Sequence, residues 1–224
     1  MDNITLVIPA KFESQSLPSV LDELKDYNYK KLIILQEDDY DTINAIKNYD
    51  CEVLYQKSKG YGDALITGIN YTKTKYFCIF NADGSFNPKE INLMLKKLEE
   101  DKLDFVFASR YQPNSGSDDD TTLTYIGNFF FTLFGKIFFN LKITDILYTF
   151  VIGKTSPCQL LNLERKDFTF CIELPIKAKQ NKLKMSSINS YERKRFAGFK
   201  KVNEIKDGFL LLRYLITLFF KKLI

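Results

Sequence analysis

Short apolar runs alternate with helical patterns through the first half of the chain. Five runs read as strands: residues 4–9, 31–36, 52–56, 75–81 and 103–111. Four stretches between them carry apolar residues at helical spacing: residues 16–27, 41–49, 62–73 and 87–100. Strands that are apolar throughout are typical of a parallel sheet covered by helices on both faces. The sequence therefore predicts an α/β fold with a Rossmann-like, mostly parallel sheet between two helical layers.

Ligands of such sheets bind just beyond the carboxyl ends of the strands. In this sequence the strand ends are followed by residues 9–13, 36–39, 57–61, 81–85 and 109–111. Because parallel strands end at the same edge of a sheet, these five segments are expected to share one rim. The candidate functional residues are expected on this rim.

The composition of the chain limits which catalytic groups and partners it can have. A chain of 224 residues is long enough for one full domain with a sizeable core. It contains no histidine, which excludes Ser–His and Cys–His nucleophiles and zinc sites with imidazole ligands. The net charge of +4 allows an anionic membrane surface or a phosphorylated ligand as a partner. No nucleic-acid recognition motif is present, so nucleic acid is not expected as a partner.

The cysteines and the amino terminus suggest a compartment. Cys51, Cys78, Cys158 and Cys171 have no paired spacing, and Cys78 falls inside an apolar strand, so we expect reduced thiols. The start of the chain has an acidic residue at position 2 and too short an apolar run for a signal peptide. A cytoplasmic protein is expected.

The stretch FNADGSFNP, residues 80–88, ends the fourth strand at a carboxylate with no basic residue beside it. One interpretation is an Asx turn followed by the start of a helix, which Asp, Gly, Ser and Asn all favour. The other is a metal and phosphate site at the end of a parallel strand, with Asp83 as its main ligand. The residues of this stretch alone leave both open.

Five rim motifs together resemble glycosyltransferase family 2, the inverting GT-A enzymes, and within it the polyprenyl- or dolichyl-phosphate sugar synthases. They are LVIPAKFESQSL, QKSKGYGDALITGI, FNADGSFNP, FASRY and TDILYTFVIGKT, and they occur in the family's order over nearly the whole chain. The resemblance implies a GT-A domain over residues 1–207, followed by a separate apolar helix over residues 208–224. It also implies transfer of a sugar from a nucleoside-diphosphate donor.

The resemblance assigns roles to rim residues. A donor diphosphate needs a divalent cation held by hard oxygen ligands, Mg²⁺ or Mn²⁺, and the motif positions for it are Asp83, Asn81 and Ser85. Lys59 would add positive charge, while the glycines beside it would let the backbone approach the nucleotide. The donor-binding positions are Pro9, Ala10, Glu13, Glu37, Asp38, Lys59, Gly60, Gly62, Asn81, Ala82 and Asp83.

Three positions depart from the family pattern. The first Asp of the metal motif is Asn81, which weakens metal affinity. The paired aspartates after strand two read QEDD, residues 36–39, so the nucleoside contacts differ. Val151 stands where an Arg often contacts phosphate. These departures place the chain on a divergent branch.

The second half is expected to hold the acceptor side. By their place in the family pattern, the resemblance implies that Asp145 and Glu173 lie near the reacting centre, with Asp145 as the first choice of general base if the acceptor is a hydroxyl. A lipid phosphate needs cations instead of a base. Arg110 is expected on the donor phosphates. The expected acceptor-binding cations are Arg193, Arg195, Lys200 and Lys201; the alternative is a solvated or membrane-facing basic patch.

Two apolar segments suggest a membrane surface. Residues 123–144 are apolar around most of a helix, with Thr124, Asn128, Thr132, Lys136 and Asn140 forming a narrow polar stripe. This helix is expected either in the core or against lipid. Residues 208–224 form a shorter apolar helix with Arg213, Lys221 and Lys222, which docking, a homo-oligomer contact or in-plane membrane binding would cover.

The leading hypothesis is thus an inverting transferase at the cytoplasmic face of a membrane, acting on a lipid-linked acceptor in cell-envelope synthesis. The same chemistry on a soluble or polysaccharide acceptor remains an alternative. A third is a non-catalytic member of the fold that binds a nucleotide-sugar or scaffolds a complex, for which Asn81 and Val151 are the support. The loop at residues 115–122, including the aspartates 118–120, is expected to be solvated.

Overall fold

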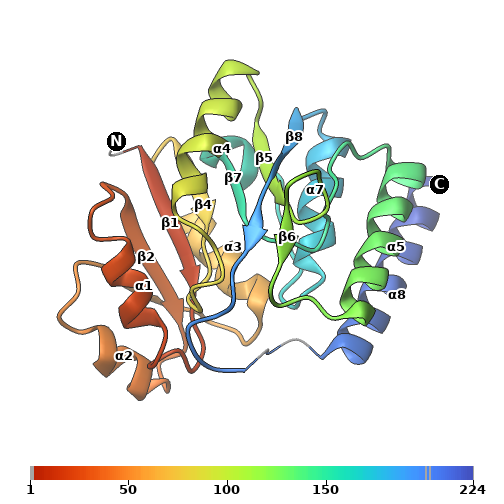
Figure 1. Ribbon diagram of the computed structural model, residues 1–224. Helices are drawn as coiled ribbons and strands as arrows, with labels where there is room; N and C mark the ends of the chain where they lie inside the picture. The colour runs from red at the N-terminus through yellow and green to blue at the C-terminus, as the bar shows by residue number, and fades with distance from the viewer. Residues whose placement is uncertain (1–2, 200, 202, 224) are drawn as a thin grey trace.

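A computed structural model of the protein describes residues 3–199, 201 and 203–223, with side chains through Phe220. Within this range a seven-stranded sheet forms the centre of the molecule, in the order β3-β2-β1-β4-β7-β5-β8 (Figure 1). Its strands are β1 (Ile4–Pro9), β2 (Lys30–Leu35), β3 (Glu52–Tyr55), β4 (Tyr76–Ile79), β5 (Phe105–Ser109), β7 (Val151–Lys154) and β8 (Met185–Asn189). Two short strands, β6 (Gly116–Ser117) and β9 (Tyr191–Glu192), pair separately beside it.

The mostly parallel sheet predicted from the sequence is confirmed. The five expected strands form, and β1, β2, β3 and β4 pair in parallel, as do β5 and β8. One strand breaks the pattern: β7 lies between β4 and β5 and runs antiparallel to both. Gly153 allows this insertion, because a Cβ there would collide with the rings of Phe105 and Phe77 from the neighbouring strands.

Helices cover both faces of the sheet. They are α1 (Leu17–Glu23), α2 (Tyr40–Ile46), α3 (Tyr61–Tyr71), α4 (Lys89–Glu100), α5 (Thr122–Phe139), α6 (Thr155–Gln159), α7 (Phe170–Gln180) and α8 (Glu204–Leu223). Alternate strand residues divide the core into two clusters: Leu6 and Ile8 pack with α1, α2 and α4, whereas Val7 faces the cluster of α3, α5, α6, α7 and α8. Because successive side chains of a strand point to opposite faces of the sheet, each strand contributes residues to both core clusters.

Helix α5 has the middle of its polar stripe, Asn128 and Thr132, turned inward, while Lys136 and Asn140 of the same stripe are exposed. Asn128 Nδ2 donates to Asp145 Oδ1 at 2.5 Å, and Thr132 Oγ1 accepts the backbone N–H of Ile146 at 3.2 Å. Phe131 and Phe139 are buried in the core, whereas seven large residues of the helix are exposed: Leu123, Tyr125, Ile126, Phe129, Phe130, Leu133 and Ile137. The helix therefore buries one apolar side together with two polar residues and leaves a second apolar side exposed.

Helix α8 docks on the domain beside α5, as Figure 1 shows at the carboxyl end of the chain. Leu211, Tyr214 and Leu215 are buried in the core, while Phe209 and Phe220 on the same helix are exposed. The helix begins at Glu204, so it continues across the expected boundary at residues 207 and 208. Docking on the domain therefore covers part of the apolar surface of α8. The side chains of Lys221 and Lys222 lie outside the described residues.

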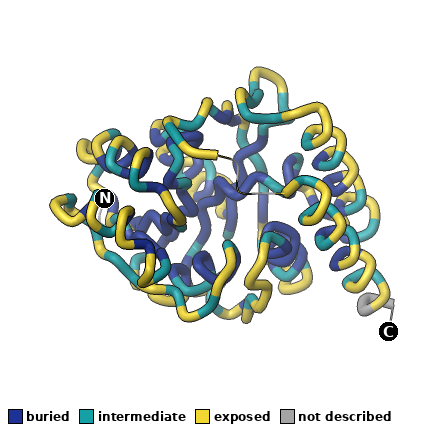
Figure 2. Tube along the Cα trace, turned by 90° about the horizontal axis from the view of Figure 1, so that it is seen from below, coloured by how far each residue is buried: buried dark blue, intermediate teal, exposed yellow. Residues whose placement is uncertain are grey.

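Seen from below, the two helices lie along one side of the molecule, and each shows buried residues toward the body and exposed residues on its outer side (Figure 2). Helix α5 is, within the described part of the chain, the helix whose length and composition would suffice to cross a membrane. About a quarter of it is buried, because it packs on α7 and α8. The four cysteines are unpaired in the structure.

Candidate active site

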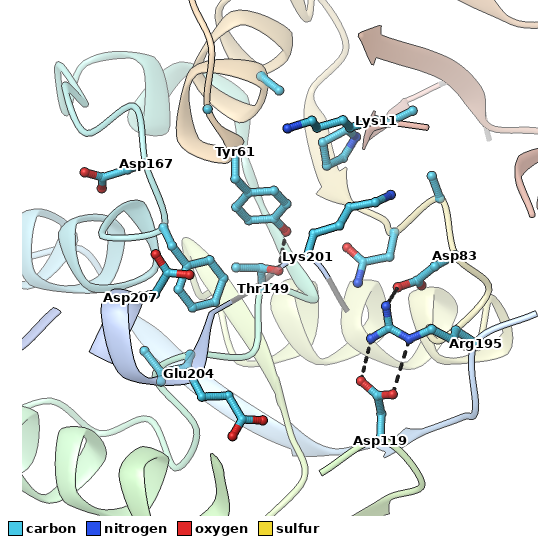
Figure 3. Close-up of a pocket in the computed structure, with 18 of the residues that line it drawn as sticks. Lys11, Tyr61, Asp83, Asp119, Thr149, Asp167, Arg195, Lys201, Glu204 and Asp207 are labelled. Atoms are coloured by element: carbon cyan, nitrogen blue, oxygen red, sulfur yellow. Dashed lines mark hydrogen bonds and ion pairs between the residues drawn. The ribbon is translucent and has the colours of Figure 1, made fainter. Parts of the chain in front are cut away.

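A cavity of about 780 Å³ opens at the carboxyl ends of β1, β2 and β4 and extends to α5 and α8. Figure 3 shows side chains from both halves of the chain converging on it. Of the expected donor-binding residues it is lined by Pro9, Ala10, Glu13, Asp38, Lys59, Gly60, Asn81, Ala82 and Asp83. The rim predicted from strand order is therefore where the structure places a cavity.

The Asp83 carboxylate divides its two oxygens between a turn and the cavity. Oδ1 accepts the backbone N–H and the hydroxyl of Ser85, at 3.0 and 2.7 Å, which makes the Asx turn. Gly84 has φ 84° in this turn, a conformation that glycine adopts without strain. Oδ2 lies 3.7 Å from Arg195 Nη1. The Asx turn expected for the FNADGSFNP stretch is present, and Oδ2 takes no part in it, so the metal interpretation stays a prediction.

The residues at this turn fit a divalent cation that is shared with a substrate. Asp83 Oδ2 and the side-chain oxygen of Asn81 are hard oxygen ligands on the cavity wall, whereas Ser85 is buried and its hydroxyl is engaged by Asp83. Among the described residues no group of three or more acidic, Cys or His side chains surrounds one point. Mg²⁺ commonly binds one or two carboxylates together with substrate phosphates and water, and this donor set suits that mode.

The part of the rim that is expected to bind the nucleoside carries carboxylates that already have partners within the protein. Glu13 accepts the Ser16 hydroxyl at 2.5 Å and pairs with Lys201. Asp39, which the sequence did not single out, caps α2 and accepts the Phe12 N–H at 2.7 Å, so it fixes the loop after β1. Glu37 is exposed and does not line the cavity, in contrast to the expectation for it.

The glycines of the Lys-Gly-x-Gly segment admit the protein's own backbone. A Cβ at Gly60 would collide with the Lys166 carbonyl oxygen, and one at Gly62 with that of Arg165. The Asp63 N–H donates to the Lys166 carbonyl at 3.0 Å, which ties the two segments together. The two glycines thus lie against the loop of residues 165–167. The expectation that Gly62 lets the backbone approach the nucleotide is therefore corrected.

Asp145 is a structural carboxylate. It is 0% exposed, does not line the cavity, and receives Arg110 Nε on Oδ2 at 2.8 Å and Asn128 Nδ2 on Oδ1 at 2.5 Å. The backbone N–H of Tyr148 also donates to Oδ1, at 3.1 Å. Both oxygens are occupied, so this structure gives Asp145 a role in positioning Arg110, and its role as general base stays a prediction.

Arg110 does line the cavity, but its N–H groups are committed to protein carboxylates. Besides Asp145, its Nη1 lies 3.2 Å from Asp120 and 3.1 Å from Glu192. Burial acts to lower the pKa of Arg110, but Asp145 and Glu192 outweigh it and raise that pKa well above its usual value. Arg110 therefore organises the acidic wall rather than offering free donors to a phosphate.

Glu173 lies away from the cavity. Its carboxylate is buried, accepts the backbone N–H groups of Glu164 and Arg165, and lies 2.9 Å from Lys177 Nζ. It holds the loop that packs on Gly60 and Gly62. The expectation that Glu173 approaches the reacting centre is therefore corrected, because backbone groups of its own loop saturate it.

The loop expected to be solvated is part of the site. Asp119 pairs with Arg195 at 2.5 Å, Asp118 accepts the Tyr191 hydroxyl at 2.6 Å, and Asp120 binds Arg110. Asp119 and Asp120 line the cavity. The three aspartates give no sign in the sequence that they belong to the site. The partners of Asp118 and Asp119 lie more than seventy residues away, and Arg110, the partner of Asp120, lies on the far side of a turn.

The expected acceptor cations separate into different places. Arg195 lines the cavity between Asp83 and Asp119 (Figure 3). Lys201 also lines the cavity and pairs with Glu13. Arg193 instead binds Glu23 at 2.6 Å and the Phe86 carbonyl, outside the cavity, so its predicted role is corrected. Lys200 lies outside the described residues.

The cavity also has an apolar arm that the sequence did not reveal. Tyr61, Leu147, Phe168 and Leu211 line it, from α3, the segment before β7, the loop before α7, and α8. The Tyr61 hydroxyl and the Thr149 hydroxyl bond each other at 2.6 Å. Burial raises the pKa of Tyr61, so this phenol stays neutral.

Comparison with known proteins identifies relatives of this chain. It is 24% identical over 209 residues to the UDP-N-acetylglucosamine–dolichyl-phosphate N-acetylglucosaminyltransferase of Methanococcus voltae, with 83% of each chain covered. It is 27% identical over 133 residues to an uncharacterized protein of Methanocaldococcus jannaschii, covering 57% of this chain and 55% of that protein. The chain spans about half the length of several curated relatives that it matches.

Solved structures share the fold. The chain resembles mannosyl-3-phosphoglycerate synthase from Rubrobacter xylanophilus with a TM-score of 0.75 at 14% identity, covering 98% of this chain and 74% of that one. It resembles glucosyl-3-phosphoglycerate synthase from Mycobacterium tuberculosis, solved with Mn²⁺ and UDP, with a TM-score of 0.71 at 13% identity, covering 96% and 79%. These likenesses confirm the predicted GT-A fold.

The family model described as Glycosyl transferase family 2 matches residues 5–161, which include β1 to β5, the Asp83 turn and Arg110. The match covers more than half of the chain and contains the motifs from which the resemblance was drawn. The protein therefore belongs to glycosyl transferase family 2.

Proposed function

We propose that the protein transfers a sugar, with inversion, from a nucleoside-diphosphate donor to a lipid-linked acceptor at the inner face of a membrane. The observation that carries the proposal is a single cavity. One end holds the family's strand-end residues, and the other reaches two helices whose outer faces are apolar and exposed. A soluble acceptor would give no reason for the apolar end.

The donor end has the groups that a nucleotide-sugar needs. Asp83 and Asn81 would hold Mg²⁺ or Mn²⁺ together with the donor diphosphate, and the bound cation would neutralise charge on the leaving nucleoside diphosphate. Lys59 and Lys11 lie exposed on the cavity wall, where they would attract the phosphates. Glu13 and Asp38 supply acceptor oxygens for hydrogen bonds from ribose or base.

The acceptor end favours a phosphate. An acceptor phosphate is already an anion and needs no general base, which agrees with the position of Asp145 behind Arg110. Arg195 and Lys201 are the cavity cations closest to Asp83 and Glu13, and a phosphate would compete with these carboxylates for them. The Methanococcus relative named for a dolichyl-phosphate acceptor supports the same choice.

A donor and acceptor screen tests this proposal. Purified full-length protein is incubated with UDP- and GDP-sugars, Mg²⁺ or Mn²⁺, and a polyprenyl phosphate in detergent, and labelled sugar is counted in the organic phase. We expect label in the organic phase with one donor class and none after chelation. Label confined to the aqueous phase would favour a soluble acceptor, and donor binding without turnover would favour a non-catalytic protein.

The membrane part of the proposal makes its own prediction. Phe129 on α5 and Leu93 on α4 are equally exposed, at 61% and 59%, but only α5 belongs to the proposed membrane face. Burying one aromatic side chain contributes about 1.5–3 kcal/mol, so Phe129→Glu should lower partitioning into anionic vesicles by about tenfold or more, while Leu93→Glu should not.

Cosedimentation at two salt concentrations provides the measurement. Binding should weaken at high salt, because Lys136 and Arg213 are exposed on α5 and α8 and would interact with anionic headgroups. Equal losses for the Phe129 and Leu93 variants would assign no special role to α5. No cosedimentation of the unmodified protein would favour a second subunit as the cover of this face.

A further inference from the structure

The apolar arm of the cavity ends at an opening between α5 and α8. The two helices touch near both of their ends: Thr121 Oγ1 lies 3.3 Å from Glu204 Oε1, and the rings of Phe138 and Phe219 are 4.9 Å apart. Between these contacts the cavity is lined by Gly127 of α5 and Gly208 of α8. The helices therefore frame the arm rather than close it.

Both glycines border free space. A Cβ added to either has no heavy atom within 4 Å, whereas added Cβ atoms at Gly62, Gly68 and Gly153 would collide with neighbouring atoms. Glycine in a helix interior costs about 0.5–1 kcal/mol relative to alanine, and here no packing contact requires it. Leu123, one turn before Gly127, lines the cavity and is 55% exposed, so this part of the cavity reaches the surface.

The opening connects two apolar environments. On its inner side lie Leu147, Phe168 and Leu211. On its outer side the residues next to the glycines, Ile126 and Phe209, are exposed, at 58% and 72%. The hydroxyls of Tyr61 and Thr149 are bonded to each other, and the Asp207 carboxylate accepts the backbone N–H of Asn203, just before α8, at 2.8 Å. Polar groups beside the arm are thus engaged within the protein.

We propose that this opening is the binding site for the hydrocarbon chain of the acceptor. The chain would pass between Gly127 and Gly208, from the lipid against which Ile126 and Phe209 lie, and would place its phosphate near Arg195 at the polar end. The proposal rests on the lipid-linked acceptor proposed above and adds the path of its chain. The continuity of one cavity from Asp83 to Gly127 and Gly208 supports it.

Filling the opening tests the proposal. Gly127→Leu and Gly208→Leu would place a side chain in the open space without a collision at Cβ, while Gly127→Ala and Gly208→Ala are the matched controls for helix propensity. Transfer is measured with a long polyprenyl phosphate and with a short, soluble prenyl phosphate, alongside donor binding by calorimetry. We expect the leucine variants to lose about tenfold or more with the long acceptor, the cost of about one displaced apolar contact group. Transfer to the short acceptor should fall much less than transfer to the long one, donor binding should be retained, and the alanine variants should lose less with the long acceptor than the leucine variants do.

The possible outcomes separate this inference from the proposed function. If the leucine variants lose no activity with either acceptor relative to the unmodified protein, or lose the same fraction with both, the proposed path of the chain is overturned. The proposal of a lipid-linked acceptor is not affected by either result. No transfer by the unmodified protein to any lipid phosphate refutes the proposed function itself. Photocrosslinking of the unmodified protein with a polyprenyl phosphate that carries a reactive group in its chain gives a second measurement, independent of how the variants fold. Labelling within residues 122–139 and 204–220 supports the path, and labelling elsewhere overturns it.

Discussion

Asp145→Ala is expected to lower the free energy of unfolding by about 3–5 kcal/mol, because it removes one partner of a buried ion pair. Arg110 Nε and Nη2, Asn128 Nδ2 and the Tyr148 N–H would all lose their acceptor. Asp120 and Glu192 would still bind Arg110 Nη1, so part of its charge stays compensated. Urea denaturation followed by circular dichroism measures the change.

Two further variants separate structure from catalysis at this position. Asp118→Ala removes a carboxylate from the same side of the molecule that binds an exposed tyrosine, and should change stability by about 1 kcal/mol or less. Asp145→Asn keeps the shape of the side chain. If Asp145→Asn kept the stability of the unmodified protein but lost turnover by orders of magnitude, Asp145 would be a catalytic group after all.

Asp83→Ala is expected to lower turnover on the order of 10²–10³-fold, since the cation that we propose it holds would contribute several kcal/mol to stabilising the leaving group. The fold should survive, because the loss in the turn is that of hydrogen bonds to Ser85, worth about 1 kcal/mol each. Mn²⁺ binding in the presence of UDP, followed by electron paramagnetic resonance, should be lost in parallel with turnover. Full activity of this variant in the presence of a chelator would end the metal hypothesis.

Arg195→Ala is the informative comparison for the metal site. Its guanidinium lies 3.7 Å from Asp83 Oδ2 and is the positive charge that the protein itself places beside this carboxylate. Its removal should therefore tighten Mn²⁺ binding while it weakens binding of the acceptor phosphate. Arg193→Ala, which removes an arginine bound to Glu23 outside the cavity, should affect neither.

Features of the fold that depend on residues close together in the sequence could be predicted, whereas features that depend on distant residues could not. The first five strands and four helices depend on periodicity within about a dozen residues, and they form where the apolar runs are. The same local rules placed Asp83 at a strand end, on the rim where the cavity lies. The position of β7 could not be read in this way, because its antiparallel insertion between β4 and β5 depends on pairing across long separations in the chain.

Side-chain partners were beyond the sequence for a related reason. Whether Asp145 and Glu173 face substrate or protein depends on which donors the fold brings to them, and Arg110, Asn128 and the 164–165 backbone are brought by different elements. The polar stripe of α5 was visible in the sequence, but only the position of Asp145 and Ile146 in the fold gives Asn128 and Thr132 of that stripe buried partners. The sequence by itself thus determined the layered sheet and the carboxylate at its rim, because these follow from backbone periodicity and strand polarity. The tertiary structure decided which carboxylates are free to act and where the cavity meets the apolar helices, because burial and pairing of charges are set by contacts distant in the chain.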